Sequence, residues 1–536
     1  MKNKPSLICL QILSFPALII TFASKILHNL VKSLELKHQT TPPLPPGPKG
    51  WPVLGCLPEM IKNRPTFRWI HNLMQQNNTE IACIRLGQVH VIPVTSPELA
   101  REFLRKQDEV FASRPDCMSG RLASSNYLTA ILSPAGHQWK KMRRIVTSEI
   151  LSPSMHRLLH VKRRQEADHL VKYVYNQCRE NGHGLVNVRV AAQHYCGNVI
   201  RKSVFGKRFF GQGTEDGGPG KEEIEHVAGA FTTVQFLYGF GMADFLPHWL
   251  EVFDFDGCKK IIRSGVDSMR KYQDPEIVKR VEMWGQGIKE REEDILDILI
   301  NLKDSENNPM LSIEEIKAQI TEIMIAAIDN PSNAVEWAIA EMIHQPHILE
   351  TARQELDRVV GRDRFVQEPD LPRLNYIKSC VKESFRLHPV NPFSPPHVST
   401  RDTTVGGYFI PEGSRVLVSR LGLGRNPRVW EDPLKYNPGR HTVVDDDCEE
   451  VVLVDHELRM FSFGTGRRGC PGVVLGSTMA TMLLARLVQG FDWAEPFDRS
   501  SCIKLAESEN ELLMAKPLIA LAKPRLEKNI YQQFLH

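Results

Sequence analysis

The loop Phe463–Gly472, which reads FGTGRRGCPG, constrains this chain more than any other segment. It is rich in glycine, carries two consecutive arginines, and places Cys470 directly before Pro471. The apolar run that follows, ending near Gly490, is typical of a helix. A cysteine just ahead of a helix lies at the positive end of the helix dipole, where the thiolate is favoured and the pKa of the thiol falls. The loop therefore predicts a thiolate site.

The spacing of the fixed residues in this loop is specific. A lone cysteine is most often an inert core residue, but the whole pattern F-x-x-G-x-R-x-C-x-G is present here. It resembles the haem-binding loop of the cytochrome P-450 superfamily. The resemblance implies that Cys470 is the axial ligand of the iron of haem b, that Phe463 packs beside its sulfur, and that Arg468 reaches a haem propionate. Gly472 would let the backbone pass close beneath the flat macrocycle.

Two further elements stand where that superfamily binds haem propionates. Trp139 and Arg143 form a W-x-x-x-R pattern on one face of an expected helix. His397 lies in the segment PPHV, where related proteins have an arginine or a histidine. The resemblance adds these three residues to the haem-binding set. The alternative readings are an aromatic ring packed under an exposed cationic helix face, and an ordinary loop histidine.

A Glu-x-x-Arg pair, Glu383 and Arg386, occupies neighbouring positions on one face of an expected helix. Such a pair is most often a solvated surface contact worth about 0.3 kcal/mol. The later segment PGRH carries Arg440 at the place of the superfamily's P-x-R segment. The resemblance implies a buried triad of Glu383, Arg386 and Arg440 that locks the core around the haem. Gly439 stands where the family often has glutamate, which puts one peripheral contact in doubt.

Helical periodicity and helix-boundary residues predict a mainly α-helical domain with small β-sheets, and the resemblance implies the cytochrome P-450 fold. One helix is expected to open at Ser133-Pro134. A second is expected from Ser312 to Gln345, beginning with a capping box and interrupted by a kink at Pro331. The other expected elements are a helix over Asn375–Leu387, strands at Ile81–Leu86 and Val89–Val94, and surface loops at Gly211–Lys221 and Asp445–Glu450.

The composition argues against several other classes of protein. The net charge of +4 over 536 residues is mild, and the chain shows no nucleic-acid motif, so nucleic acid is not an expected partner. The 11 cysteines are scattered without C-x-x-C pairs. This argues against a disulfide framework or a zinc site and favours a reducing compartment. No second linker or repeat interrupts residues 51–536, which we expect to form one domain.

The N-terminus predicts a membrane anchor. No charged residue occurs from Pro5 to Ser24, and about 20 helical residues span the ~30 Å hydrocarbon core of a bilayer. A cleaved signal peptide is the alternative, but no clear cleavage site follows. We expect the anchor and its flank in residues 1–40 and a semi-rigid, proline-rich hinge in residues 41–50. This order resembles microsomal cytochromes P-450 and implies the endoplasmic reticulum membrane, with the catalytic domain on the cytosolic face.

The long central helix narrows the resemblance. Most members of the superfamily carry a threonine there that helps to relay protons, whereas this chain has Asn330 followed by Pro331. This pair, together with the segments FRLHP, PHVS, GLGRNP and AKPL, resembles the plant amino-acid N-monooxygenases that produce aldoximes. The resemblance implies that an L-amino acid is hydroxylated twice at nitrogen and then loses water and carbon dioxide. Asp329 and Asn330 would be the catalytic residues that manage protons or hold the polar head of the substrate.

The same resemblance implies dioxygen as co-substrate and NADPH as electron source, through NADPH-cytochrome P-450 reductase. The next enzyme of an aldoxime pathway would be a further partner. The reductase is expected to dock on a cationic face made by Lys140, Lys141, Arg144 and Arg467. The product would feed cyanogenic glucosides, glucosinolates or volatile nitrogenous defence compounds.

The segments expected to face the substrate are mostly apolar: Gly120–Leu128, Thr232–Phe240, Ile325–Asn333, Val390–Phe393 and Glu511–Leu513. They favour an apolar amino acid, phenylalanine slightly ahead of valine, isoleucine and leucine.

Two alternative functions stay open. The first is a plant cytochrome P-450 that hydroxylates carbon in a terpenoid or a phenolic, which the identity of the product would distinguish. The second is an inactive haem-binding membrane protein. It would be expected to have lost Cys470, Arg386 or Glu383, and all three are present.

Overall fold

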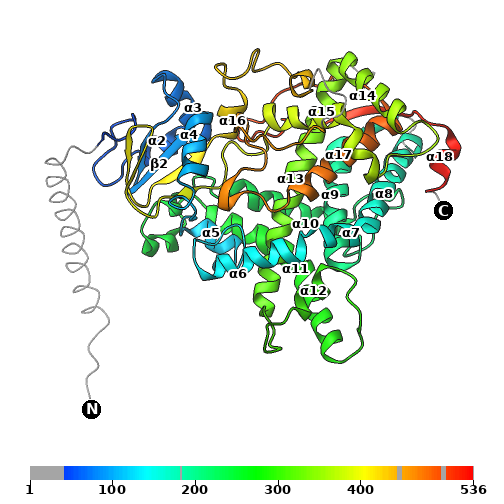
Figure 1. The fold of residues 1–536 in the computed structure, drawn as a ribbon, viewed down its shortest axis with the longest axis horizontal. Coiled ribbons are helices and arrows are strands. Elements are labelled where there is room, and N and C mark those ends of the chain that lie inside the picture. Colours follow the sequence, from blue (N-terminus) through cyan, green and yellow to red (C-terminus); the bar gives the residue numbers. More distant parts are fainter. Residues whose placement is uncertain (1–41, 181–183, 443–449, 497–501, 535–536) are drawn as a thin grey trace.

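A computed structural model describes residues 42–180, 184–442, 450–496 and 502–534 (Figure 1). The expected anchor in residues 1–40 and most of the acidic stretch Asp445–Glu450 lie outside the described residues. The division into anchor, hinge and domain therefore stays a prediction. In the described part, the one helix long and apolar enough to cross a membrane is α17 (Val473–Gly490), and 67% of it is buried inside the protein, as in a core helix.

The described chain is mainly helical, as predicted, and the long helix α13 (Ile313–His344) runs through the middle of the molecule (Figure 1). It packs against α9, α10, α15 and α17, so the residues it carries lie at the centre of the fold. The other helices are α2 (Leu57–Lys62), α3 (Thr66–Gln76), α4 (Pro97–Arg101), α5 (Met118–Ala123), α6 (His137–Ile145), α7 (Pro153–Leu158), α8 (His160–Glu180), α9 (Val188–Phe205), α10 (Lys221–Phe236), α11 (Cys258–Gly285), α12 (Ile295–Asn301), α14 (Pro346–Val359), α15 (Asn375–Leu387), α16 (Arg420–Gly424) and α18 (Lys528–Gln532).

Helix α13 begins as predicted but is not interrupted at Pro331. The Ser312 side chain accepts from the N–H of Glu315, and the Glu315 carboxylate accepts from the N–H of Ser312, which completes the capping box. The helix continues through Pro331 to His344. Proline removes one intrahelical hydrogen bond, but the packing of the surrounding turns holds the helix together. A kink at this position stays a prediction.

Helix α15 has the predicted bounds, whereas the predicted start of α6 at Ser133 is wrong. Helix α6 begins at His137 with Gly136 as its cap. The Ser133 hydroxyl instead donates to the carbonyl oxygens of Tyr127 and Thr129, at 2.5 Å each. A serine followed by proline fits a turn as well as a helix cap, and here the turn uses the hydroxyl.

In the residues that the structure describes, three small sheets accompany the helices. The largest has the order β1-β2-β7-β4, in which only β2 and β7 run parallel. Strand β2 matches its prediction, but β1 begins at Ile84, because Ile81 makes only an isolated bridge to Val94. The strands are β1 (Ile84–Leu86), β2 (Val89–Val94), β4 (His397–Val398) and β7 (Arg415–Val418) in this sheet, β3 (Leu185–Asn187), β9 (Ile519–Pro524) and β8 (Phe491–Ala494) in the second, and β5 (Thr403–Val405) and β6 (Tyr408–Ile410) in the third. The largest sheet therefore carries His397 on β4 and leads from β7 directly into α16.

Candidate active site

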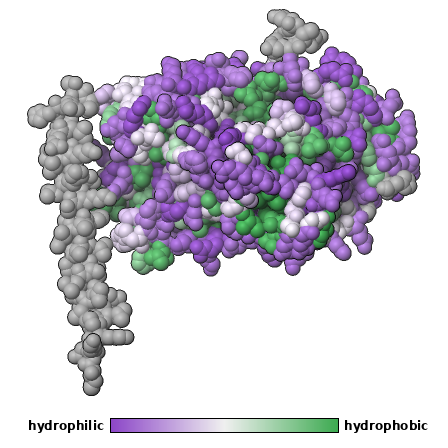
Figure 2. Space-filling view, turned by 60° about the horizontal axis from the view of Figure 1, so that its bottom comes forward, coloured by the Kyte–Doolittle hydropathy of each residue, from purple (hydrophilic) through white to green (hydrophobic). Residues whose placement is uncertain are grey.

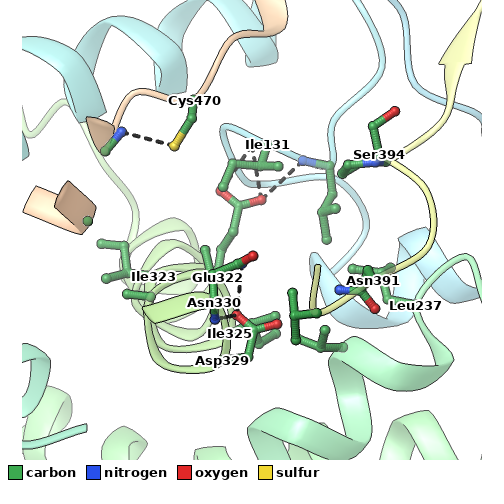
Figure 3. Close-up of a pocket in the computed structure, with 18 of the residues that line it drawn as sticks. Ile131, Leu237, Glu322, Ile323, Ile325, Asp329, Asn330, Asn391, Ser394 and Cys470 are labelled. Carbon is green, nitrogen blue, oxygen red and sulfur yellow. Dashed lines mark hydrogen bonds between the residues drawn. The ribbon is translucent and has the colours of Figure 1, made fainter. Parts of the chain in front are cut away.

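The loop before α17 places Cys470 in the wall of a cavity of about 900 Å³. The Cys470 N–H donates to the carbonyl oxygen of Phe463 at 2.8 Å, and its Sγ accepts from the N–H of Gly472 at 3.3 Å (Figure 3). Gly472 is also the cap of α17. Burial raises the pKa of the Cys470 thiol, while this N–H and the cations Arg143 and Arg420 oppose the rise. The predicted fall in the pKa of this thiol is therefore wrong, because the effect of burial outweighs that of the Gly472 N–H and the two cations.

The shape of this loop depends on Gly466. Its φ of 70° lies in the left-handed region, and a Cβ there would stand 2.3 Å from the carbonyl oxygen of Leu104. The loop can therefore pack this closely only with glycine. Phe463 also lines the cavity and packs edge-on against Phe385, with ring centroids 5.8 Å apart.

Three arginines and a histidine line the same cavity: Arg114, Arg143, Arg468 and His397. Within the described part of the chain, the hydrogen bonds of the three arginines go to backbone carbonyl oxygens rather than to carboxylates. Burial and the neighbouring arginines lower the pKa of Arg468 to about 8. Burial lowers the pKa of Arg114 to about 10, and burial with Arg114 holds the pKa of His397 well below its usual range. His397 is therefore neutral, and the three arginines form a cationic cluster that has no carboxylate partner among the described residues.

An unsatisfied donor lies beside the cationic cluster. The Nε1 of Trp139 is buried and has no hydrogen-bond partner among the described residues, while the Arg468 guanidinium lies 4.1 Å from the centre of the Trp139 ring. Buried donors and buried charges both require partners. The two propionates of a haem whose iron faces Cys470 would supply them, so the residues present fit the expected haem. The individual roles of Trp139, Arg143, His397 and Arg468 stay proposals.

The structure brings Glu383, Arg386 and Arg440 together. The Arg386 Nε and Nη2 donate to the two carboxylate oxygens of Glu383, at 2.8 and 2.7 Å, and both side chains are fully buried. The Arg440 Nε donates to Glu383 Oε1 at 3.0 Å. His441 is a fourth member of this cluster, which the sequence did not predict. Its Nε2 lies 2.7 Å from Glu383 Oε2. Despite burial, Arg386 and His441 lower the pKa of Glu383 to about 2.

Gly439, which stands where the family often has glutamate, lies only at the edge of this cluster. Gly439 is exposed, and its N–H donates to Asn437 Oδ1 at 3.1 Å. Arg386 also donates to the carbonyl oxygens of Gly424, Pro433 and Lys435. The cluster therefore fastens the end of α16 and the segment of residues 433–441 to α15, and its role in holding the haem site stays a proposal.

Asp329 and Asn330 lie together on α13 in the cavity wall (Figure 3). Asp329 Oδ1 accepts from the Asn330 N–H at 2.7 Å and from its Nδ2 at 3.1 Å. Asn330 Oδ1 accepts from the Nη1 of Arg420, the first residue of α16, at 3.2 Å. Burial raises the pKa of Asp329 to about 6, while the hydrogen bond from Asn330 and the charge of Arg420 oppose the rise. Sequence reasoning missed Arg420, which is distant in the chain and belongs to no recognised motif.

Glu322 is a second residue that sequence reasoning missed. It lies two turns before Asp329 on α13 and reaches toward the loop around Ile131 (Figure 3). Its carboxylate accepts from the N–H groups of Ala130, Ile131 and Leu132 at 3.0 to 3.1 Å. Burial raises the Glu322 pKa, and the hydrogen bonds it accepts oppose that rise. Glu322 thereby ties this loop to the central helix.

The cavity lining agrees with four of the five segments expected to face the substrate. Residues from 232–240, 325–331, 390–393 and 511–513 contribute to it. Gly120–Leu128 does not, and residues 130–132 take its place. The reason is Glu322, which draws that later part of the loop toward α13.

Comparison with known proteins matches the chain to one family. The family model described as Cytochrome P450 matches residues 45–522. The chain is 53% identical over 518 residues to valine N-monooxygenase 1 of Manihot esculenta, covering 96% of this chain and 94% of that protein. It is 53% identical over 498 residues to a phenylalanine N-monooxygenase of Prunus mume, covering 92% of each. It is 52% identical over 521 residues to a tryptophan N-monooxygenase of Prunus mume, covering 96% of this chain and 97% of that protein.

Proposed function

The chain belongs to the cytochrome P450 family, and from this premise we propose that it converts an apolar L-amino acid into the corresponding aldoxime. As a family member it is a haem-thiolate monooxygenase that uses dioxygen and electrons delivered by a reductase. In the proposed reaction the α-nitrogen is hydroxylated twice, each time consuming one dioxygen and two electrons. The dihydroxylated amino acid then loses carbon dioxide and water.

The observation that carries the proposal is a polar cluster in a largely apolar cavity. Asp329, Asn330 and Arg420 form one hydrogen-bonded and charged group in the cavity wall. A terpenoid or a simple phenolic has no charged groups that would match these side chains, whereas an amino acid is a zwitterion. The cluster therefore favours the amino acid over the alternative of carbon hydroxylation.

Separate residues of the chain would hold the haem, bind the substrate and orient the binding groups. Haem, when bound, supplies the activation of dioxygen, and Cys470 would hold its iron. Asp329 would accept hydrogen bonds from the substrate's ammonium group and take up a proton from it. Asn330 would orient both charged side chains. Its side-chain Nδ2 donates to Asp329, and its side-chain Oδ1 accepts from Arg420. The apolar wall would exclude water from the reacting nitrogen.

The identity of the side chain is the finer part of the proposal. The lining residues Phe231, Phe236, Phe240 and Phe393 give the cavity aromatic walls, which supports phenylalanine slightly ahead of valine, isoleucine and leucine. The aldoxime would feed cyanogenic glucosides, glucosinolates or volatile nitrogenous defence compounds, through the next enzyme of such a pathway.

The proposed location is the endoplasmic reticulum membrane. The face drawn in Figure 2 is mostly polar with separate apolar patches. Among the described residues, Trp249, Val252, Phe253 and Phe255 have 58 to 71% of their surface exposed. Exposed apolar residues close together in the chain are typical of a membrane or protein contact. Loss of membrane binding after removal of residues 1–40 would support the anchor, and a full-length protein found entirely in the soluble fraction would contradict it.

The proposed reaction is tested by co-expressing the chain with NADPH-cytochrome P-450 reductase and supplying single L-amino acids. Gas chromatography with mass spectrometry would then identify the aldoxime. We expect Asn330→Ala to lower aldoxime formation more than about tenfold with the haem spectrum intact, because a hydrogen bond to a charged group contributes ~1.5–3 kcal/mol. A wild-type enzyme that yields no aldoxime from any protein amino acid would refute the proposal.

A further inference from the structure

One arginine in the cavity is not accounted for by the haem-facing cluster. Arg64 pairs with Asp256, and Arg163 pairs with Glu368. The arginines at 114, 143 and 468 belong to the cationic cluster. Arg420 remains, and among the residues that the structure describes no carboxylate lies within ion-pair distance of it. The Nε of Arg420 is buried and has no hydrogen-bond partner in that described part of the chain.

A charged side chain in this position needs an anion. Burial disfavours the charged form of Arg420 and lowers its pKa, although Asp329 and Cys470 oppose that shift. An arginine nevertheless stays protonated near neutral pH. The Asp329 carboxylate does not contact the guanidinium directly, because it accepts from Asn330 instead. A desolvated cation without a contacting anion is costly, and a bound anion removes that cost.

Asn330 fixes which edge of the guanidinium is available. Its amide lies between a carboxylate and a guanidinium, so the acceptor Oδ1 must face Arg420 and the donor Nδ2 must face Asp329. The Arg420 Nη1 is thereby engaged. The adjacent Nε and Nη2 form the opposite, forked edge, which matches the two oxygens of a carboxylate.

We propose that Arg420 binds the α-carboxylate of the amino-acid substrate through its Nε and Nη2, with Asn330 as the residue that positions it. This inference rests on the proposed function and extends it to a residue for carboxylate recognition. Asp329, held on the other side of Asn330, then receives the ammonium group. The spacing of the two charged side chains across one amide selects an α-amino acid over an amine or an acid alone.

The arrangement also gives a route to product release. When the carbon–carbon bond to the carboxylate breaks, its electron pair forms the C=N bond while one N–O bond breaks, so that carbon dioxide and water leave and the remaining aldoxime is neutral. It has no group for the guanidinium fork, so Arg420 contributes to binding of the substrate but not of the product. The aldoxime should therefore bind the wild-type enzyme more weakly than the amino acid does.

The test pairs ligands with variants. Purified, haem-loaded wild type, Arg420→Ala and Arg420→Lys are titrated with L-phenylalanine and L-valine, and with the amide of each, following the change in haem absorbance. The amide keeps the amino group and removes the carboxylate charge. Haem content and the reduced carbon monoxide spectrum verify that each variant is folded. Arg428→Ala is the matched control, since Arg428 pairs with Glu80 and Glu98 at the surface.

We expect Arg420→Ala to weaken binding of the amino acid at least about tenfold, but to change binding of the amide less than about threefold. The affinity of Arg420→Lys for the amino acid should lie between those of wild type and Arg420→Ala, because lysine keeps the positive charge but lacks the forked pair of N–H donors. In wild type alone, the amide should bind at least about tenfold more weakly than the acid, which tests the idea even if the variants do not fold. Equal losses for acid and amide, or equal wild-type affinities, would overturn the role of Arg420 while leaving the proposed function intact. A wild-type enzyme that binds no amino acid and makes no aldoxime would overturn both.

Discussion

His441 Nε2 lies 2.7 Å from Glu383 Oε2, on the same carboxylate that Arg386 and Arg440 bind. Three basic side chains therefore hold one buried acid, and the family's triad is a cluster of four in this chain. Because His441 directly follows Arg440, a single short segment supplies two of the contacts. Glu383 is the common partner, so its removal would leave Arg386 buried without a counter-charge.

We expect Glu383→Gln to lower the free energy of unfolding by about 3–5 kcal/mol, which is the usual cost of breaking a buried ion pair. His441→Ala should cost less, about 1.5–3 kcal/mol, because it removes one hydrogen bond to a charged group. Thermal unfolding and haem content per chain would measure both. Arg362→Ala, which breaks an exposed pair with Asp357, serves as the control and should cost about 1 kcal/mol or less. Equal effects of all three changes would refute the special role of the cluster.

Replacing Cys470 by serine should abolish the thiolate-specific absorbance of the reduced carbon monoxide complex. A serine hydroxyl stays protonated near neutral pH and is a poor ligand for this iron. The spectrum of the reduced protein with carbon monoxide would measure the change, and Cys502→Ser, at an exposed cysteine outside the cavity lining, is the control. A surviving thiolate signal would show that another residue is the ligand.

Trp139→Phe should weaken haem retention about tenfold. The change keeps a ring under the Arg468 guanidinium but removes the unsatisfied Nε1–H, which we expect to donate to a propionate. The rate of haem transfer to an excess of a haem-binding acceptor protein would report the loss independently of catalysis. Trp430→Phe is the matched control, because Trp430 Nε1 already donates to the carbonyl oxygen of Leu423 away from the cavity. Unchanged transfer in Trp139→Phe would contradict the proposed contact.

Most contacts that local sequence patterns encode were predictable, although Ser133 does not cap α6. Contacts between distant segments were predictable only where the family resemblance supplied them, as for Glu383 and Arg440. The capping box at Ser312 and the end of α15 at Leu387 follow from adjacent residues, and both were predicted correctly. The hydrogen bond between Asn330 and Arg420 joins positions 90 residues apart and has no local pattern. The hold of Glu322 on residues 130–132 is equally non-local. Such contacts depend on how helices and loops pack together, which periodicity does not specify.

The apparent second-order rate constant for aldoxime formation should fall as the pH drops through about 6. Burial raises the Asp329 pKa to about 6, so the carboxylate is ionised above this pH and neutral below it. Only the ionised form is a strong acceptor for the substrate's ammonium group. An ordinary aspartate, with a pKa near about 3.9, would show no change in this range. Asp329→Asn should lower the rate and remove this part of the pH profile. If the fall in rate near pH 6 persisted in Asp329→Asn, the titration of another group would be its cause.

Charge reversal at Lys140 and Arg144 should slow electron delivery by the reductase, especially at low salt. The structure narrows the expected docking face, because Lys141 pairs with Glu315 at 2.7 Å and Arg467 pairs with Asp108 at 3.1 Å. Lys140 and Arg144 are exposed on α6. Surface charges steer association, and the effect weakens as salt screens them. Stopped-flow measurement of haem reduction would test this, with charge reversal at Lys523, an exposed residue on β9, as the control. Identical rates for the two variants at low ionic strength would argue against this face.

Glu322 and Asp329 belong to one rigid rod, α13, separated by seven positions or about 10.5 Å. Glu322 secures the loop of residues 130–132, and Asp329 begins the polar cluster, so one helix sets the distance between them. Residues from 323–327 of the same helix form part of the cavity wall, but the other wall segments, at 231–240, 390–393 and 510–513, lie outside it. Much of the wall is thus separate in the chain from Asp329, Asn330 and Arg420. Exchange of these three wall segments between relatives is therefore a practical route to enzymes with new amino-acid preferences, because α13 and Arg420 would stay in place.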